Sequence, residues 1–196
     1  MDTVTASTSR DRRTLETRPI APSLFAHFVL KSSNAAAMVD WYRTVLNMRV
    51  AYRNDMLTFL TYDEEHHRLA IINIPGLAAP GDGNSGLSHV AYAFPRVGDL
   101  LATYRRLKSQ GIEPFWPVHH GPTLSLYYHD PDGNSVELQV DCFGKAEAAA
   151  YFQTEAFARN PIGVVFDPEA LASAYEAGAP EAELLRQPDG PTAAVP

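Results

Sequence analysis

The residues best suited to chemistry in this chain are one glutamate and two histidines on segments with the pattern of β-strands. Glu137 lies within residues 135–140, where aliphatic and polar side chains alternate. Because successive side chains of a strand point to opposite faces, Glu137 lies on the face away from the aliphatic residues. A carboxylate in mid-strand is uncommon, and it is costly to bury without a partner. Unless this face of the strand is simply solvated, Glu137 needs a cation.

His27 and His89 occupy matching positions in two copies of one sequence pattern. Each lies in a short apolar run of strand length, and a shift of 62 positions places His27 on His89. A lone histidine on an apolar strand is more often a hydrogen-bonded core residue than a metal ligand. Two histidines at matching positions, together with a mid-strand carboxylate, favour a shared role as ligands.

The elements that position these residues are predicted to follow the order strand, helix, strand, strand, strand, twice over. In the first unit we predict strands at residues 24–30, 50–53, 56–62 and 68–74, and a helix at residues 35–47. In the second unit we predict strands at residues 86–94, 114–118, 123–128 and 135–140, and a helix at residues 97–110. A unit of this kind covers one face of its sheet with its helix, so the other face needs a partner. Two units side by side would form a cup.

The predicted cup brings the three residues to one point. If the units pair about a pseudo-twofold axis, His27 faces His89, and the last strand carries Glu137 towards them. The position of the first unit that corresponds to Glu137 is Ala70, so a fourth protein ligand is missing. Two histidines and one carboxylate with vacant coordination positions are the arrangement of non-heme Fe(II) oxygenases. The sequence therefore predicts a metal site with room for reactants.

Composition restricts the function further. The chain has 196 residues, 45% of them hydrophobic, and a net charge of −7, which is ordinary for a soluble globular protein. The absence of a long apolar run and of a basic stripe leads us to expect no membrane span and no nucleic-acid partner. The single cysteine, Cys142, excludes an intrachain disulfide and a thiolate cluster, and it favours a cytoplasmic location. We interpret it as a small buried hydrophobic residue.

The whole chain is predicted to be an α+β protein with two βαβββ units in a half-open barrel around the metal site. We predict a flexible arm at residues 1–22, a two-unit domain at residues 23–143 with units 23–75 and 86–143, and a partly helical extension at residues 144–196. The extension carries an apolar strip, residues 164–166. We expect this strip to pack over the open sheet or across a subunit boundary, so a homo-oligomer is expected.

The sequence resembles the vicinal oxygen chelate superfamily, and within it the one-domain form of the type I extradiol ring-cleaving dioxygenases. The resemblance runs from residue 24 to residue 143 and rests on the segments FAHFVL, LSHVAY and YYHDPDGNSVELQ. It implies that His27, His89 and Glu137 bind Fe(II), with Mn(II) as the alternative metal. It also implies that the substrates are a small aromatic diol and dioxygen.

The resemblance further implies an acid–base histidine and a tyrosine that hydrogen bonds to the bound substrate. The tyrosine corresponds to Tyr127. The histidine belongs to the loop before that strand, where this chain has His119 and His120, and both stay open as the acid–base residue. A histidine can accept and release a proton near neutral pH. The competing readings are an exposed loop for the two histidines and simple strand packing for Tyr127.

Two other functions are compatible with the same fold. A glyoxalase-type isomerase or lyase would prefer nickel or zinc and a fourth protein ligand, which Ala70 does not supply. A metal-free small-molecule-binding protein would hold a flat ligand without chemistry and would not need the three ligands. Phe115, Trp116 and Tyr128 are candidate walls for an aromatic ligand, whereas we interpret the neighbouring pair His66 and His67 as solvated.

Overall fold

The structure is a computed structural model that describes residue 15, residues 18–78 and residues 85–196. Most of the predicted arm and the middle of the predicted linker lie outside the described residues. Module one contains β1 (Phe28–Ser32), α1 (Ala35–Leu46), β2 (Arg49–Arg53), β3 (Leu57–Thr61) and β4 (Leu69–Asn73). Module two contains β5 (His89–Phe94), α2 (Val97–Lys108), β6 (Trp116–His119), β7 (Thr123–His129) and β8 (Ser135–Asp141).

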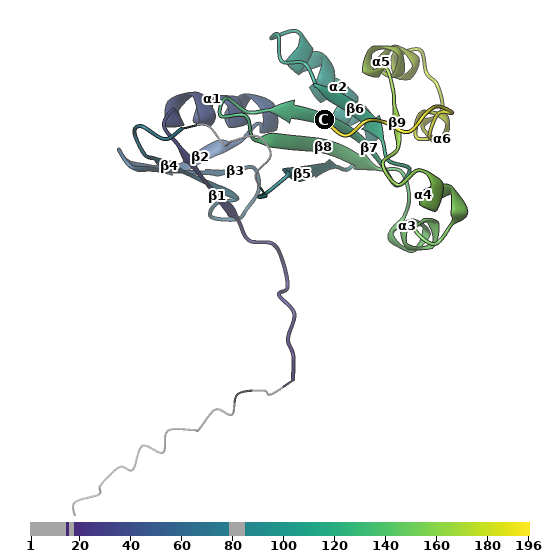
Figure 1. Cartoon of the computed structure of the whole chain (residues 1–196). Coiled ribbons are helices and arrows are strands. Elements are labelled where there is room, and N and C mark those ends of the chain that lie inside the picture. Colours follow the sequence, from purple (N-terminus) through teal and green to yellow (C-terminus); the bar gives the residue numbers. More distant parts are fainter. Residues whose placement is uncertain (1–14, 16–17, 79–84) are drawn as a thin grey trace, which may run out of the picture.

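The predicted α+β class and the duplicated βαβββ order are confirmed. Sheet one has the strand order β1-β4-β3-β2, and sheet two has the order β5-β8-β7-β6-β9, where β9 is Val164–Val165. In both modules the first strand runs parallel to the fourth. The two sheets lie side by side without closing into a barrel (Figure 1).

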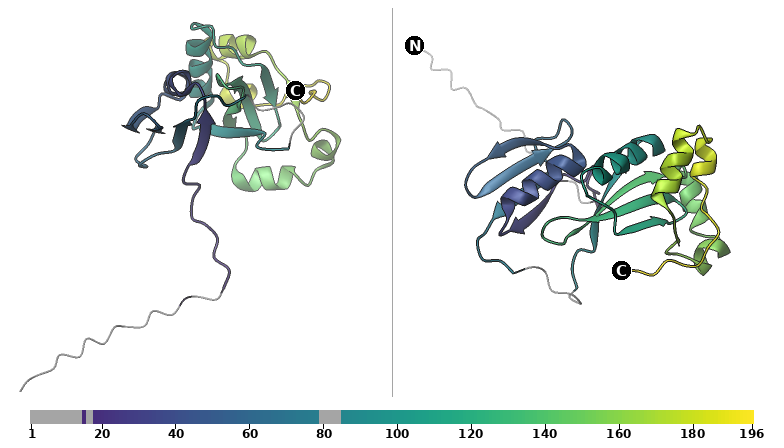
Figure 2. Two further views of the ribbon diagram at one scale, coloured as in Figure 1. Left: turned by 60° about the vertical axis from the view of Figure 1, so that its left-hand side comes forward. Right: turned by 90° about the horizontal axis from the view of Figure 1, so that it is seen from above.

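Each helix covers one face of its own sheet, and the two helices also pack against each other. Buried residues of α1, α2 and the helix-facing strand positions form one continuous hydrophobic cluster, which includes Met38, Tyr42, Leu60, Leu69, Leu100, Leu107, Leu126 and Leu138. The view from above places α1 beside α2 (Figure 2). We call the face of each sheet opposite its helix the open face. Both open faces lie on the side of the sheets away from the two helices (Figure 1).

The predicted hairpin turn between β7 and β8 is confirmed, and it joins the two modules. Asp130 is nearly buried, and its carboxylate accepts hydrogen bonds from the backbone and side chain of Asn134 and from the backbone of Asp132. The hydroxyl of Tyr42 on α1 donates to the same carboxylate at 3.1 Å. Gly133 takes a φ of 85°, which closes the turn. One turn thus connects module two to the helix of module one.

The first strand begins later than predicted. The sequence predicts a strand from residue 24, but β1 starts at Phe28. The guanidinium of Arg68 binds the carbonyls of Phe25 and Ala26, which a strand would use in its ladder. His27 therefore lies immediately before the strand.

The C-terminal extension forms four short helices and one strand in the described residues. They are α3 (Lys145–Tyr151), α4 (Glu155–Arg159), β9, α5 (Pro168–Glu176) and α6 (Glu181–Leu184). The helix predicted at residues 145–158 is divided, because Thr154 caps a new helix by accepting from the backbone of Phe157. The apolar strip at residues 164–166 extends the edge of sheet two beside β6, which differs from the predicted packing over a face. None of the described helices is long and apolar enough to cross a membrane.

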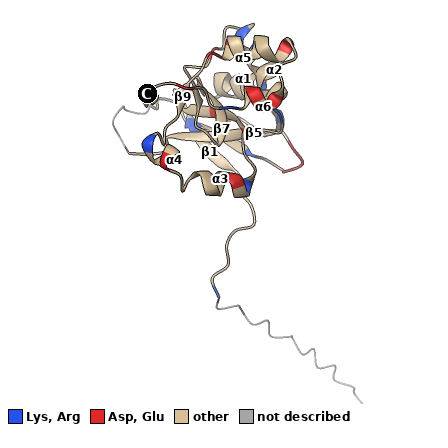
Figure 3. Ribbon diagram, turned by 90° about the vertical axis from the view of Figure 1, so that its right-hand side faces the viewer, with Lys and Arg blue, Asp and Glu red and all other residues tan. Residues whose placement is uncertain are grey.

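Helix α5 is held against α2 by a cluster of charged side chains. Glu169 on α5 accepts hydrogen bonds from Lys108, Arg105 and Tyr104 of α2. The lysine hydrogen bond is the main reason that the pKa of Glu169 lies below its usual value. Acidic and basic positions are mixed over these helices (Figure 3).

We predict that Tyr42→Phe weakens the connection between the modules. The change removes a buried hydrogen bond to a carboxylate, a class of bond worth about 1.5–3 kcal/mol. Urea denaturation should show a loss in the free energy of unfolding of this size. Tyr52→Phe is the matched control, since Tyr52 is 51% exposed. Equal stability of the two variants would contradict the assigned role of the bond.

We predict that Glu169→Gln lowers stability in a pH-dependent way. The folded-state pKa of Glu169 is depressed, so its contribution is present above the unfolded-state pKa of about 4.5 and is lost as the pH falls through the folded value. Thermal melts of the variant and the wild type should therefore differ at pH 7 and converge in acid. Glu147→Gln, at an exposed position of α3, is the control and should match the wild type at both pH values.

Candidate metal and acid–base site

The site is built around His89 and Glu137 on neighbouring strands of sheet two. β5 and β8 are parallel, with Ala91 beside Glu137, so His89 lies one side-chain step away on the same open face. His89 Nε2 lies 3.0 Å from Glu137 Oε2. The side chain of Glu137 is 6% exposed, whereas that of His89 is 37% exposed. The contact supplies the cationic or donor partner that a buried carboxylate requires, and it keeps one side of the imidazole open.

Tyr127 lies directly opposite Glu137 on β7. Its ring meets the ring of His89 edge to face at 5.3 Å between centroids. Burial raises the pKa of Tyr127, and the neighbouring carboxylate of Glu137 raises it further. The phenol is therefore a protonated hydrogen-bond donor at neutral pH.

His120 joins this group through Tyr127. Its Nε2 lies 3.0 Å from the Tyr127 hydroxyl, and its Nδ1 contacts the carbonyl oxygen of Ile162. A carbonyl can only accept, so Nδ1 carries the hydrogen and a neutral ring has its lone pair on Nε2. Tyr127 then donates to His120. Of the two candidate acid–base histidines, His120 is the one in contact with Tyr127.

His119 has different surroundings. It is 1% exposed, its Nδ1 accepts from the backbone N–H of Gly121, and its Nε2 contacts the carbonyl of Leu185. Burial holds the pKa of His119 below its usual value, against the opposing effect of the Leu185 carbonyl. Cys142 lies beside it, with Sγ 3.6 Å from Nε2, and burial raises the pKa of this thiol to about 12. His119 therefore connects the core to the C-terminal extension.

Aromatic side chains border the site on one side. Trp116 lies opposite Tyr127 in the sheet, with ring centroids 4.8 Å apart, and its edge meets His120. The indole N–H of Trp116 is buried and has no hydrogen-bond partner among the described residues. Phe115 stacks on His129 at 3.9 Å. Tyr128, the third predicted wall residue, points instead to the helix side and is part of the buried core.

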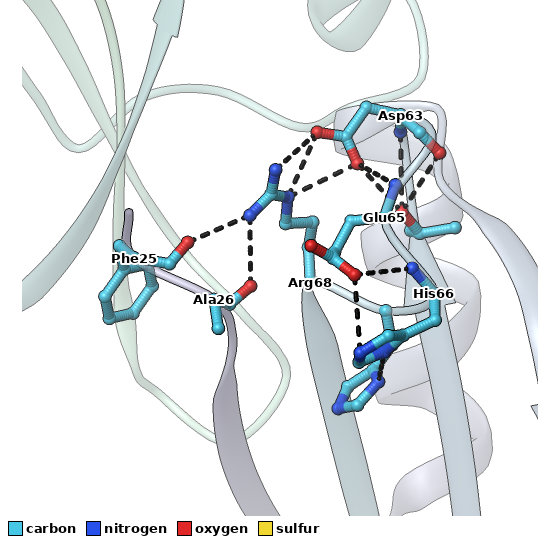
Figure 4. Close-up of polar contacts among 8 residues, drawn as sticks. Phe25, Ala26, Asp63, Glu65, His66 and Arg68 are labelled. Carbon is cyan, nitrogen blue, oxygen red and sulfur yellow. Dashed lines mark hydrogen bonds and ion pairs between the residues drawn. The ribbon is translucent and has the colours of Figure 1, made fainter. Parts of the chain in front are cut away.

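His27 lies on the entry to β1 in module one. Its ring is 4.3 Å from the ring of His67, which stacks on Phe59. Arg68 holds the two residues before His27 by their carbonyls, and its guanidinium is itself bound to the carboxylate of Asp63 (Figure 4). His66 is exposed as predicted, whereas His67 is only partly so.

The donor set suits a metal only in part within one chain. An imidazole nitrogen and a carboxylate oxygen at one open point are ligands of divalent first-row metals. However, the described residues contain no group of three or more His, Cys, Asp or Glu that could hold a metal ion. His89 and Glu137 are thus brought together, while His27 has other neighbours.

One functional contact was not foreseen from the sequence, namely the carbonyl of Ile162 that orients His120. The loop that presents it approaches β6 closely, because a Cβ at Gly163 would lie 2.3 Å from the carbonyl oxygen of His119. The residues 160–163 signal a break between helices, but a backbone carbonyl has no sequence signature. Nothing in the local pattern places this loop beside His120.

Comparison with known proteins agrees with this geometry. The family model of the Glyoxalase/Bleomycin resistance protein/Dioxygenase superfamily matches residues 24–138. The chain is 51% identical over 158 residues to biphenyl-2,3-diol 1,2-dioxygenase 2 of Rhodococcus globerulus, which covers 80% of this chain and 83% of that protein. It is 49% identical over 168 residues to biphenyl-2,3-diol 1,2-dioxygenase 3 of the same organism, which covers 84% of this chain and 88% of that protein.

A solved structure with the same fold is a putative glyoxalase from Bacillus halodurans. It has a TM-score of 0.52 at 12% identity and covers 60% of this chain and 96% of that chain, so the likeness concerns the fold alone. The family match spans more than half of the chain, and the two relatives are about half identical to it over most of their length. The chain belongs to the glyoxalase/bleomycin resistance protein/dioxygenase superfamily.

Proposed function

We propose that this protein is an Fe(II)-dependent extradiol dioxygenase, which inserts both atoms of dioxygen into a catecholic ring beside its hydroxyl groups. The observation that carries the proposal is the contact of His89 with the buried carboxylate of Glu137, on the same open face as Tyr127 and His120. The two relatives of about 50% identity are named as dioxygenases of an aromatic diol, which agrees with this chemistry.

Three residues are proposed to hold the metal: His89, Glu137 and His27. When bound, Fe(II) would supply a site for the two substrate hydroxyls and for dioxygen. Glu137 brings negative charge to the site from a buried position, and His89 presents its open side to solvent. Mn(II) has the same ligand preferences and is the alternative metal.

Tyr127 and His120 are proposed to handle the substrate proton. With Nδ1–H fixed on the Ile162 carbonyl, Nε2 of His120 is free to accept a proton that passes through the Tyr127 hydroxyl. After His120 is protonated, Nε2–H donates to the Tyr127 oxygen, and the proton can return later in the reaction. Trp116 limits the space on this side and favours a flat, aromatic ligand.

The substrate class follows from the relatives and from the walls of the site. Both relatives are named for a biphenyl diol, a catechol that carries an aryl group. We therefore expect aryl-substituted catechols to be better substrates than unsubstituted catechol.

The first test of the proposal is direct. Protein reconstituted with Fe(II) under anaerobic conditions should take up oxygen and form a yellow product when 2,3-dihydroxybiphenyl is added. Glu137→Ala should remove both the iron and the activity, since it deletes the carboxylate ligand. His66→Ala, at an exposed position of module one, is the control and should keep both. Silence of the iron-loaded protein across plain, aryl-substituted and carboxylated catechols would reject the proposal.

The acid–base assignment predicts different effects for the two adjacent histidines. His120→Gln should lower kcat by about 10²–10⁴-fold, the range for loss of a general acid–base group, while the iron content stays unchanged. His119→Gln should mainly lower the free energy of unfolding, because His119 is a buried connection to Leu185. Stopped-flow turnover and urea denaturation of both variants provide the comparison. A large loss of kcat in His119→Gln alone would reverse the assignment.

A further inference from the structure

We propose that each metal site is completed by a second copy of the chain, with His27 of one copy joining His89 and Glu137 of the other. The inference rests on the proposed function and adds to it the source of the third ligand. It also commits to one occupant for the open faces, which is another copy of this protein.

The first argument is the incomplete site within one chain. His89 and Glu137 are in contact at 3.0 Å, but the described residues provide no third ligand to this pair. His27, the other histidine at an equivalent position, contacts His67 of its own module. One chain therefore has a two-ligand half-site in module two and a lone imidazole in module one.

The second argument is that the two half-sites are equivalent in register. In sheet one Val29 pairs with Ala70, and in sheet two Ala91 pairs with Glu137 in the same parallel arrangement. His27 and His89 each lie two residues before the first member of these pairs. The open face of sheet one thus presents an imidazole where sheet two presents its own, but with alanine in place of the carboxylate.

The third argument is the way in which the modules of one chain are joined. Tyr42 on α1 binds Asp130 of module two, and Arg106 on α2 donates to the carbonyl of Val45 at 3.1 Å. The helices of both modules belong to one hydrophobic cluster, so the modules meet through their helical sides. Both open faces remain on the other side of the sheets (Figure 1). Closing them on each other within one chain would require breaking these contacts.

The fourth argument is the uncovered apolar surface on the open face of sheet one. By register, the row across this sheet consists of Val29, Ala70, Phe59 and Tyr52. Val29 is 47% exposed and Tyr52 is 51% exposed, and the preceding Phe25 is 70% exposed. On the open face of sheet two, Ala91 of β5 is also exposed. Covering such surface is favourable.

A twofold axis satisfies all four observations at once. It places module one of each copy against module two of the other, so both copies bury the same surfaces and two equal metal sites form. The arrangement is closed, which limits the assembly to a dimer. Light scattering should give twice the chain mass of 21.5 kDa.

The decisive experiment mixes two defective variants. His27→Ala and Glu137→Ala chains with different affinity tags are co-expressed, and the hybrid dimer is isolated by both tags in turn. In a shared site, one of its two sites carries both defects and the other is intact. We therefore expect the hybrid to bind one Fe(II) per dimer and to regain about half of the wild-type activity, whereas each variant alone binds none.

The matched control is the pair His89→Ala and Glu137→Ala, whose changes lie in the same half-site. Every site of that hybrid has one defect, so it should bind no iron. Glu137→Gln serves as a second variant if Glu137→Ala folds poorly, with circular dichroism to verify folding. Iron is measured by mass spectrometry and is independent of turnover.

The outcomes separate this inference from the proposed function. An iron-loaded wild type that is monomeric, or an iron-free hybrid of His27→Ala with Glu137→Ala, overturns the shared site and leaves the dioxygenase proposal standing. A dimeric wild type that binds iron, shows complementation of iron binding and cleaves no catechol supports the shared site and overturns the dioxygenase proposal. A wild type that binds no iron overturns both.

Discussion

A carboxylate at the centre of a β-sheet must have partners, and the site of this protein depends on how Glu137 obtains them. Its side chain is almost fully buried, and His89 and Tyr127 approach it from the two neighbouring strands. Desolvation penalises the carboxylate strongly unless donors or a cation offset it. A metal ion bound by the same oxygen atoms would offset that penalty more fully than a half-exposed imidazole. The same burial that destabilises an empty site therefore favours its occupation.

Duplication of the module explains why the ligands are arranged unequally. Equivalent strand registers provide an imidazole in each module, but the carboxylate exists only in module two, because Ala70 takes its place in module one. With three protein ligands, a six-coordinate ion keeps positions for substrate and dioxygen. A fourth ligand at residue 70 would remove one of these positions. This asymmetry separates dioxygenase chemistry from the isomerase chemistry considered for the same fold.

Local sequence patterns were sufficient for the repeated elements and for the pair at the centre of the site. The β7–β8 turn, both long helices and the placement of Glu137 on the face opposite Leu138 follow from turn residues and from periods of 3.6 and 2. The predicted closure of the sheets around one ion did not appear within a chain, because it depends on which surfaces the modules use to meet. Likewise, the order of His119 and His120 is set by long-range contacts of the extension, which no local pattern encodes.

The C-terminal extension links stability to catalysis through these two adjacent histidines. β9 pairs with β6, which fixes the distance between the extension and the end of that strand. His119 points into the core and contacts Leu185, and His120 points to the open face and contacts Ile162. Because adjacent strand residues face opposite sides, one segment of backbone can hold the extension with one ring and orient a proton acceptor with the next. Loosening the extension would then free the tautomer of His120 before it unfolded the modules, so proton transfer is more sensitive to this contact than the fold is.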